Sequence, residues 1–324
     1  MKRSFIAAAF AAGFLATIAG PANAEWPADR PIRVVVGFGA GGGTDIAARI
    51  IAEPLGKLLN QSVVIENKPG AGGSIATESV VRSDKDGYTA LMISTGHTVG
   101  AVMLKAAARY DAVKDLAPVS LVASSTFVFV AKKEFAANDL KGLIALAKTS
   151  PGKLNFASVG VGSTQHIVGE LMAQKAGIEV KHIPYRGSPA LVSALIAGDV
   201  DYGVETFQAV QGQVEGGKLK LLAVGSAKRA PNAPDVPTVA ESGVPGYAVS
   251  GWYGFVYPAG VPQPIVDKTY AALKTVLAQP DIRDKLSKIG ADATTSTPGE
   301  FGALLADEVA KWKEVREKAG LEAQ

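Results

Sequence analysis

Short β-branched runs alternate with longer helical patterns from residue 32 onward, and this alternation restricts the possible fold more than any other feature. Strand-like runs lie at 32–36, 62–66 and 89–93, and a second series follows at 127–130, 154–158, 179–183 and 218–224. Helical patterns with apolar residues on one face separate most of these runs. Alternation of this kind is typical of an α/β fold.

Three strand–helix junctions share one design, at 37–45, 94–98 and 158–166. In each, a strand runs into a turn rich in Gly, Ser or Thr, and a helix follows. In a parallel sheet such turns lie at the carboxyl edge of the strands, where α/β proteins bind ligands. Their backbone N–H groups and helix N-termini attract anions without a Lys or Arg, although Gly-rich turns also exist only to reverse the chain. Loops of this design in both halves predict two anion cradles that face each other across a cleft.

The first of these loops also fits a different ligand. Gly37, Gly39 and Gly42 match G-x-G-x-x-G after a strand, and Glu66 ends the next strand, which is the dinucleotide-binding fingerprint in outline. Asp45 weighs against this alternative because it brings a carboxylate to the place that a pyrophosphate would approach. The N-terminus, described next, also predicts export, and an exported protein meets little nicotinamide cofactor.

The N-terminus predicts export. Lys2 and Arg3 precede an apolar run at 5–18, and Pro21 leads into the small-x-small sequence 22–24. These are the three parts of a secretory signal peptide, and the apolar run is shorter than the roughly 20 residues that a membrane-spanning helix needs. We expect cleavage after Ala24 and a mature protein that is soluble in the periplasm of a Gram-negative cell.

Length and composition restrict the mature chain further. Removal of 24 residues from the 324 leaves 300, a length that suggests two lobes. The net charge of the full chain is only +3 and aromatic residues make up 7%, so a nucleic-acid surface is not indicated. The chain has no cysteine, which excludes disulfides, a thiol nucleophile and a Cys-ligated metal.

Catalysis has little support in the sequence. The three histidines are His97, His166 and His182, and none lies at metal-ligand spacing from another ligand type. His166 falls in the first turn of a predicted helix, where it could donate to a ligand or simply pack. Asp45 could act as a general base on position alone, but a helix cap is the more usual role. The G-x-S-x-G nucleophile motif is absent. We therefore expect no enzyme, no metal and no cofactor.

Long stretches of the chain resemble the periplasmic substrate-binding proteins of tripartite tricarboxylate transporters, the Bug family. The resemblance spans nearly the whole mature chain in order. The matching stretches are WP at 26–27 with RPIR at 30–33, VVGFGAGGGTDIAAR at 35–49, VIENKPGAGGSI at 64–75, GSTQH at 162–166, HIPYRG at 182–187, LIAGDVD at 195–201 and APDVPTVAESGVPGY at 233–247.

The resemblance implies a periplasmic-binding-protein fold of type II, with two α/β lobes and a ligand cleft at their interface. The lobes would comprise 25–125 and 226–324 for the first, and 126–225 for the second. Such a protein is a monomer that closes on a small organic anion and delivers it to membrane permease subunits. The anion could be a di-, tri- or aromatic carboxylate.

The resemblance also assigns ligand-binding positions. In the first lobe these are Phe38, Ala40, Gly41, Thr44, Asp45, Gly72, Ser94 and Thr95. In the second they are Ser158, Gly162, Ser163, Thr164 and Phe207, and His166 is added as a candidate because of its place in the first turn of the predicted helix. Arg186 is either a charge partner of the ligand or structural. The aromatic rings of Phe38, Tyr185 and Phe207 either stack on an aromatic ligand or wall the cleft.

Overall fold

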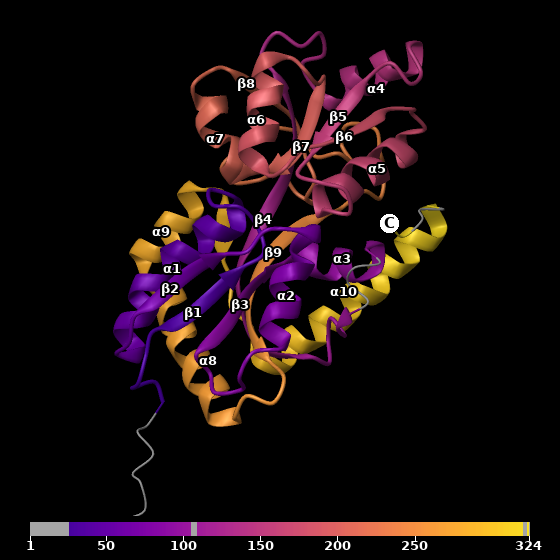
Figure 1. The fold of residues 1–324 in the computed structure, drawn as a ribbon. Coiled ribbons are helices and arrows are strands. Elements are labelled where there is room, and N and C mark those ends of the chain that lie inside the picture. The colour runs from indigo at the N-terminus through magenta and orange to yellow at the C-terminus, as the bar shows by residue number, and fades with distance from the viewer. Residues whose placement is uncertain (1–25, 105–108, 320–322, 324) are drawn as a thin grey trace, which may run out of the picture.

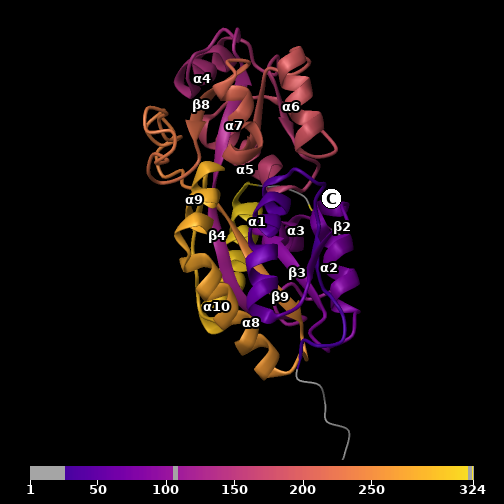
Figure 2. The same ribbon diagram turned by 90° about the vertical axis from the view of Figure 1, so that its left-hand side faces the viewer.

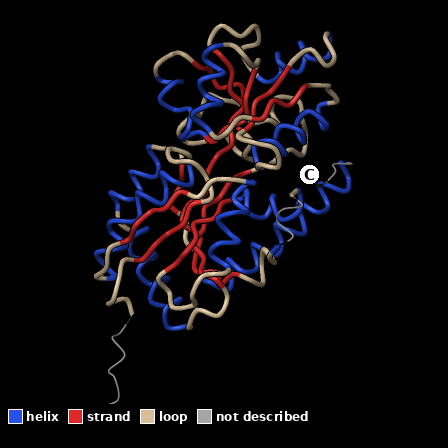
Figure 3. Tube along the Cα trace, viewed as in Figure 1, coloured by secondary structure: helices blue, strands red, loops and turns tan. Residues whose placement is uncertain are grey.

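The computed structural model describes residues 26–104, 109–319 and 323, and it confirms the predicted α/β fold. The predicted signal peptide at 1–24 lies outside the described residues. Two α/β units lie end to end. We call the one at the bottom of Figure 1 the first lobe and the one at the top the second lobe. In both, strands form the middle layer and helices the outside (Figure 3).

The first lobe is built on a mixed sheet. Three parallel strands, β1 (Ile32–Val36), β2 (Val63–Asn67) and β3 (Thr89–Ser94), lie beside the antiparallel strand β9 (Ser250–Pro258). β1 points alternate side chains to opposite faces. Val34 and Val36 pack in a core with α1 (Gly43–Leu59), α8 (Gln263–Ala278) and α9 (Pro280–Lys288). Val35 packs on the other face, with α2 (Ser74–Val81) and α10 (Pro298–Ala319). The short helix η1 (Ala71–Gly73) precedes α2, and α3 (Thr95–Met103) follows β3.

The second lobe repeats this arrangement with a smaller sheet. β5 (Asn155–Ser158) pairs in parallel with β6 (Lys181–Pro184) and β7 (Tyr202–Thr206). The helices α4 (Leu140–Thr149) and α5 (Thr164–Ala176) cover one face, where Phe129 and Phe156 are buried. The helices α6 (Ser188–Ala197) and α7 (Phe207–Glu215) cover the other, against Val128 and Val130. β8 (Leu219–Val224) lies antiparallel to the end of β4.

One long strand joins the two sheets. β4 (Leu116–Lys132) pairs with β9 over 116–126 and with β7 from Phe127 onward. The short strand β10 (Ala291–Ala293) also pairs with β4, on the side of the first lobe. The two sheets therefore share a continuous backbone, and the pairing partner changes between Thr126 and Phe127.

Two later segments also run between the lobes. The segment between β8 and β9 lies beside the second lobe (orange in Figure 2), where Val239 and Tyr247 are buried in the same core as Phe129. α10 starts in the first lobe, where Phe301 is buried with Val35, and its Trp312 belongs to the core that contains Phe129. The lobe boundaries near residues 125 and 225 stay a prediction.

Candidate functional site

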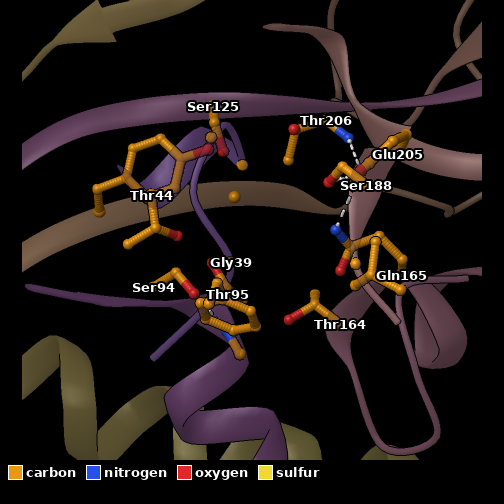
Figure 4. Close-up of a pocket in the computed structure, with 18 of the residues that line it drawn as sticks. Gly39, Thr44, Ser94, Thr95, Ser125, Thr164, Gln165, Ser188, Glu205 and Thr206 are labelled. Atoms are coloured by element: carbon orange, nitrogen blue, oxygen red, sulfur yellow. Dashed lines mark hydrogen bonds between the residues drawn. The ribbon is translucent and has the colours of Figure 1, made fainter. Parts of the chain in front are cut away.

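A pocket of about 170 Å³ is lined by residues of both lobes (Figure 4). The first lobe contributes the loop before α1, the start of α3, Ser125 and the stretch Gly251–Tyr253. The second lobe contributes Phe127, Val159, the start of α5, the turn at 186–189, Glu205 and Thr206. Both sheets thus turn the carboxyl ends of their parallel strands toward the same cavity, as the design of the loops predicts.

Five helices begin at this pocket. Thr44, Thr95, Thr164 and Ser188 lie at or next to the first residues of α1, α3, α5 and α6, and Thr206 is the N-cap of α7. A helix N-terminus carries the equivalent of roughly half a positive charge, so their convergence favours an anion. Three of these N-termini follow the predicted loops. The turns before α6 and α7 were not among the loops predicted to bind the ligand.

The loop before α1 is held in shape by Asp45. This buried carboxylate accepts hydrogen bonds from the Gly41 N–H at 2.9 Å and from Asn67 Nδ2 at 2.8 Å, and it forms an ion pair with Arg49 at 2.9 Å. Burial alone would raise the pKa of Asp45, but the hydrogen bonds from Arg49, Gly41 and Asn67 outweigh it and lower the pKa. Asp45 and Gly41 were predicted to bind the ligand. Neither lines the pocket, and the structure places them behind the loop as its anchor.

The predicted residues that line the pocket are mostly small or hydroxyl-bearing. They are Phe38, Ala40, Thr44, Ser94, Thr95 and Thr164. Ser94 Oγ accepts a hydrogen bond from Gly96 N–H and caps α3, and Thr95 Oγ1 accepts one from Trp252 N–H at 2.9 Å. In the part of the chain that the structure describes, the hydroxyls of Thr44 and Thr164 have no hydrogen-bond partner. They are therefore available to a ligand.

The remaining residues of the predicted second cradle lie behind the pocket wall. Ser163 is the N-cap of α5, because its Oγ accepts from His166 N–H at 3.2 Å and donates to the Gly160 carbonyl at 2.7 Å. Gly162 N–H donates to His166 Nδ1 at 3.2 Å, and Ser158 Oγ lies 2.6 Å from His182 Nε2. The polar groups of these residues are hydrogen-bonded within the second lobe, and none of the residues lines the pocket.

His166 of α5 and His182 of β6 form a stacked pair. Their ring centroids are 3.8 Å apart, and Phe156 packs beside both rings. Burial lowers the pKa of His166 to about 4, and burial together with the neighbouring His166 lowers the pKa of His182 to about 3. Both imidazoles are therefore neutral near pH 7. Of the two roles that the sequence left open for His166, packing is the one that this arrangement fits.

Gly72 and Phe207 also lie away from the pocket lining. Gly72 has φ +61° and contributes to a separate cavity of about 10 Å³ beside Phe38. Phe207 is buried in the core of the second lobe, next to Gly290. The aromatic residues of the pocket wall are instead Phe38, Phe127, Trp252 and Tyr253.

Glu205 is the principal residue that the sequence did not identify. It is fully buried and lines the pocket at the end of β7. Its carboxylate accepts hydrogen bonds from Ser188 Oγ at 2.5 Å, Thr206 N–H at 3.0 Å and Gln165 Nε2 at 3.3 Å. Burial raises the pKa of Glu205 to about 7, although these three donors act in the opposite direction. The signal in the sequence was the same as for the other loops, a polar residue where a strand gives way to a helix.

The dinucleotide alternative loses support at two positions. Glu66, the residue expected to bind a ribose, is half exposed and pairs with Arg33 at 3.0 Å. The Gly41 N–H, which would face a pyrophosphate, already donates to Asp45. Within the described ranges, no group of three His, Asp or Glu side chains could hold a metal ion.

Comparison with known proteins gives a consistent result. Residues 47–321 match the model of the tripartite tricarboxylate transporter family receptors. Protein BugT of Bordetella pertussis is 34% identical over 310 residues, which cover 95% of each chain.

Two solved structures have the same fold and comparable identity. Rpa4515 of R. palustris, described with adipate, is 32% identical with a TM-score of 0.88, and the match covers 92% of this chain and 99% of that one. MatC of Rhodopseudomonas palustris, described with bound malate, is 33% identical with a TM-score of 0.82, and the match covers 88% and 98% of the two chains. None of the helices in the described residues is long and apolar enough to span a bilayer.

Proposed function

This chain belongs to the family of tripartite tricarboxylate transporter receptors, and we propose that it captures a small organic carboxylate in the pocket and delivers it to a membrane permease. The observation that carries the proposal is the convergence of five helix N-termini on one cavity. Backbone N–H groups at helix N-termini bind carboxylates without a cationic side chain. The open hydroxyls of Thr44 and Thr164 add two donors to the same wall.

The pocket also carries a cation at its exposed side. Arg186 lines it through an exposed side chain, whereas Glu205 is buried. A guanidinium can form two parallel hydrogen bonds to a carboxylate, so Arg186 is suited to meet an anion as it enters. Two structural relatives are described with adipate and malate, and this supports a carboxylate as the ligand here.

Binding without chemical conversion fits the arrangement of the polar groups. The described residues include one hydrogen bond between a serine and a histidine side chain, that of Ser158 and His182, and neither residue lines the pocket. A nucleophile and its base must both reach the substrate. We infer that the ligand leaves the pocket unchanged and that the two lobes close on it about the shared strand β4.

The proposal includes export. The sequence at 1–24 has the pattern of a signal peptide, and a receptor that serves a membrane permease must work outside the cytoplasm. Protein recovered from the periplasm should begin at Glu25, as N-terminal sequencing would determine. Gel filtration coupled to light scattering should give the mass of a monomer.

A thermal-shift screen of the mature protein tests the binding function. The screen has two sets of compounds. The first comprises succinate, malate, adipate, citrate, benzoate and their ω-amide and amino analogues. The second comprises NAD and NADP. A ligand present at 100 times its Kd stabilises a protein by about 2.7 kcal/mol. We expect a shift from at least one carboxylate, and chromatography of the released ligand should recover it unchanged. A shift from a dinucleotide alone, or conversion of the ligand, would refute the proposal.

A further inference from the structure

The second-lobe wall of the pocket carries a carboxylate of the protein itself. Glu205 lines the cavity with no exposed surface, and the groups bonded to it are Ser188, Thr206 N–H and Gln165. All three donors are neutral. Figure 4 shows Glu205, Ser188 and Gln165 together on one side of the pocket, opposite Thr44, Ser94 and Thr95.

This carboxylate takes the position that two helices offer to an anion. Ser188 is the first residue of α6, and Thr206, whose N–H donates to Glu205, is the N-cap of α7. The positive ends of α6 and α7 are thus already matched by Glu205. A carboxylate of the ligand at this wall would meet a like charge in a place that water does not screen.

Gln165 extends the acceptor surface. It lines the pocket at the start of α5, and its Nε2 donates to Glu205. Gln165 still offers its carbonyl oxygen, which is an acceptor, and the second hydrogen of its Nε2. Glu205 accepts three hydrogen bonds, and a carboxylate has about four acceptor positions. Glu205 therefore keeps about one acceptor position for a ligand, and the Gln165 carbonyl adds an acceptor beside it.

The opposite wall has the reverse character. The N-termini of α1 and α3 lie there, with the open hydroxyl of Thr44 and with Ser94 and Thr95. Thr164 adds an open hydroxyl from α5, and Figure 4 shows it between the two walls. The pocket thus has donors on the side of α1 and α3, whereas the second-lobe side holds the buried Glu205 carboxylate together with the Thr206 hydroxyl and the exposed Arg186 guanidinium. Two equivalent anion cradles, as the loops alone suggest, would have no buried carboxylate on either side.

We propose that Glu205 determines specificity, so that the pocket prefers a ligand with one carboxylate and a hydrogen-bond donor at its other end over a dicarboxylate of the same length. The carboxylate of the ligand lies on the wall of α1 and α3. The donor of the ligand, an amide or an ammonium group, bonds Glu205. This inference rests on the proposed function, because it names the class of carboxylate that the receptor takes.

The experiment uses three matched probes at two lengths. Adipate, its monoamide and 6-aminohexanoate form the longer set, and succinate, succinamate and 4-aminobutanoate form the shorter one. Calorimetric titration at pH 8 keeps Glu205 ionised, because its pKa is about 7. We expect the wild-type protein to bind the amide or the amino acid of one length at least tenfold more tightly than the corresponding dicarboxylate.

Glu205→Gln tests the residue itself. The amide oxygen of the new side chain can accept from Thr206 N–H and Gln165, and its NH₂ can donate to Ser188, so the local network is retained. The preference over the dicarboxylate should fall at least tenfold in this variant. Glu53→Gln removes the same charge from an exposed site on α1 and should leave every affinity unchanged.

The outcomes separate the two proposals. Tighter binding of the amide identifies a neutral donor, tighter binding of the amino acid a cationic one, and either supports the role of Glu205. A wild-type protein that binds a dicarboxylate at least as tightly, with the ratio unchanged in Glu205→Gln, overturns the specificity and leaves the receptor function standing. Failure of all probes and of the wider carboxylate screen overturns both.

Discussion

Two adjacent residues at the start of α5 should have opposite roles, although each is only 3% exposed. Ser163 caps the helix with two hydrogen bonds to its own backbone, to His166 N–H and the Gly160 carbonyl. Thr164 lines the pocket, and its hydroxyl has no partner among the described residues. We therefore predict that Ser163→Ala lowers stability and spares binding, whereas Thr164→Val weakens binding and spares stability.

The magnitudes follow from these contacts. Loss of an N-cap costs about 1 kcal/mol, and the Gly160 carbonyl still accepts from Ser163 N–H and Ser158 Oγ, so Ser163→Ala should lower the free energy of unfolding by about 1 kcal/mol. The melting temperature should fall by roughly 2–4 °C. A hydrogen bond to a charged ligand contributes about 1.5–3 kcal/mol, so Thr164→Val should raise Kd by roughly 10- to 100-fold.

Calorimetric titration and urea unfolding of the two variants measure both quantities on the same samples. Valine keeps the shape of threonine, so unfolding of Thr164→Val should stay within about 0.5 kcal/mol of wild type. A Kd for Thr164→Val that equals the wild-type value would refute the assignment of its hydroxyl to the ligand. An equal loss of affinity in Ser163→Ala without loss of stability would refute the division between cap and pocket.

Three further predictions concern charge, pH and packing. Arg186→Gln should raise Kd by roughly 3- to 10-fold, and the difference should shrink in high salt because the side chain is exposed; a salt-independent effect would contradict this role. Because the pKa values of His166 and His182 are depressed to about 4 and 3, the unfolded chain binds more protons below pH 6.5, and stability falls as pH falls toward 4. Urea titrations at pH 7 and 5 should show that the free energy of unfolding falls by about 1–2 kcal/mol per imidazole. They should use Glu205→Gln, because the raised pKa of Glu205 changes stability in the opposite direction between pH 4.5 and 7. Gly254→Ala would place a Cβ 2.0 Å from Phe301 Cζ in a buried site and should cost about 1–3 kcal/mol with Kd unchanged, whereas wild-type stability would show that the ring moves freely.

The loops of the site could be predicted because they depend on local chemistry. A strand that ends in small polar residues before a helix places that helix N-terminus at the sheet edge, and the loops at 37–45 and 94–98 and the start of α5 all lead to the pocket. The side chains within a loop are harder to predict. A cap residue such as Ser163 bonds its own helix, whereas its neighbour Thr164 lines the cavity, and composition does not distinguish them.

The residues that sequence analysis missed depend on pairing between distant segments. Ser125 and Phe127 are two positions apart on β4, so they share a face, but the strand pattern was recognised only from residue 127. The polar stretch at 124–126 hid the earlier half of a strand that is 17 residues long. Glu205 reaches Ser188 and Gln165 only once β7 lies beside β5, which no local pattern reveals.

The shared strand β4 has a consequence for how the protein unfolds. Its residues are buried in both lobes, with Val122 in the core of the first and Phe129 in the core of the second. If either sheet melts, the other loses the ordered continuation of a central strand, and α10 loses one of its two anchoring cores. Differential scanning calorimetry should therefore show one cooperative transition, with equal van't Hoff and calorimetric enthalpies, in a molecule whose shape suggests two independent units.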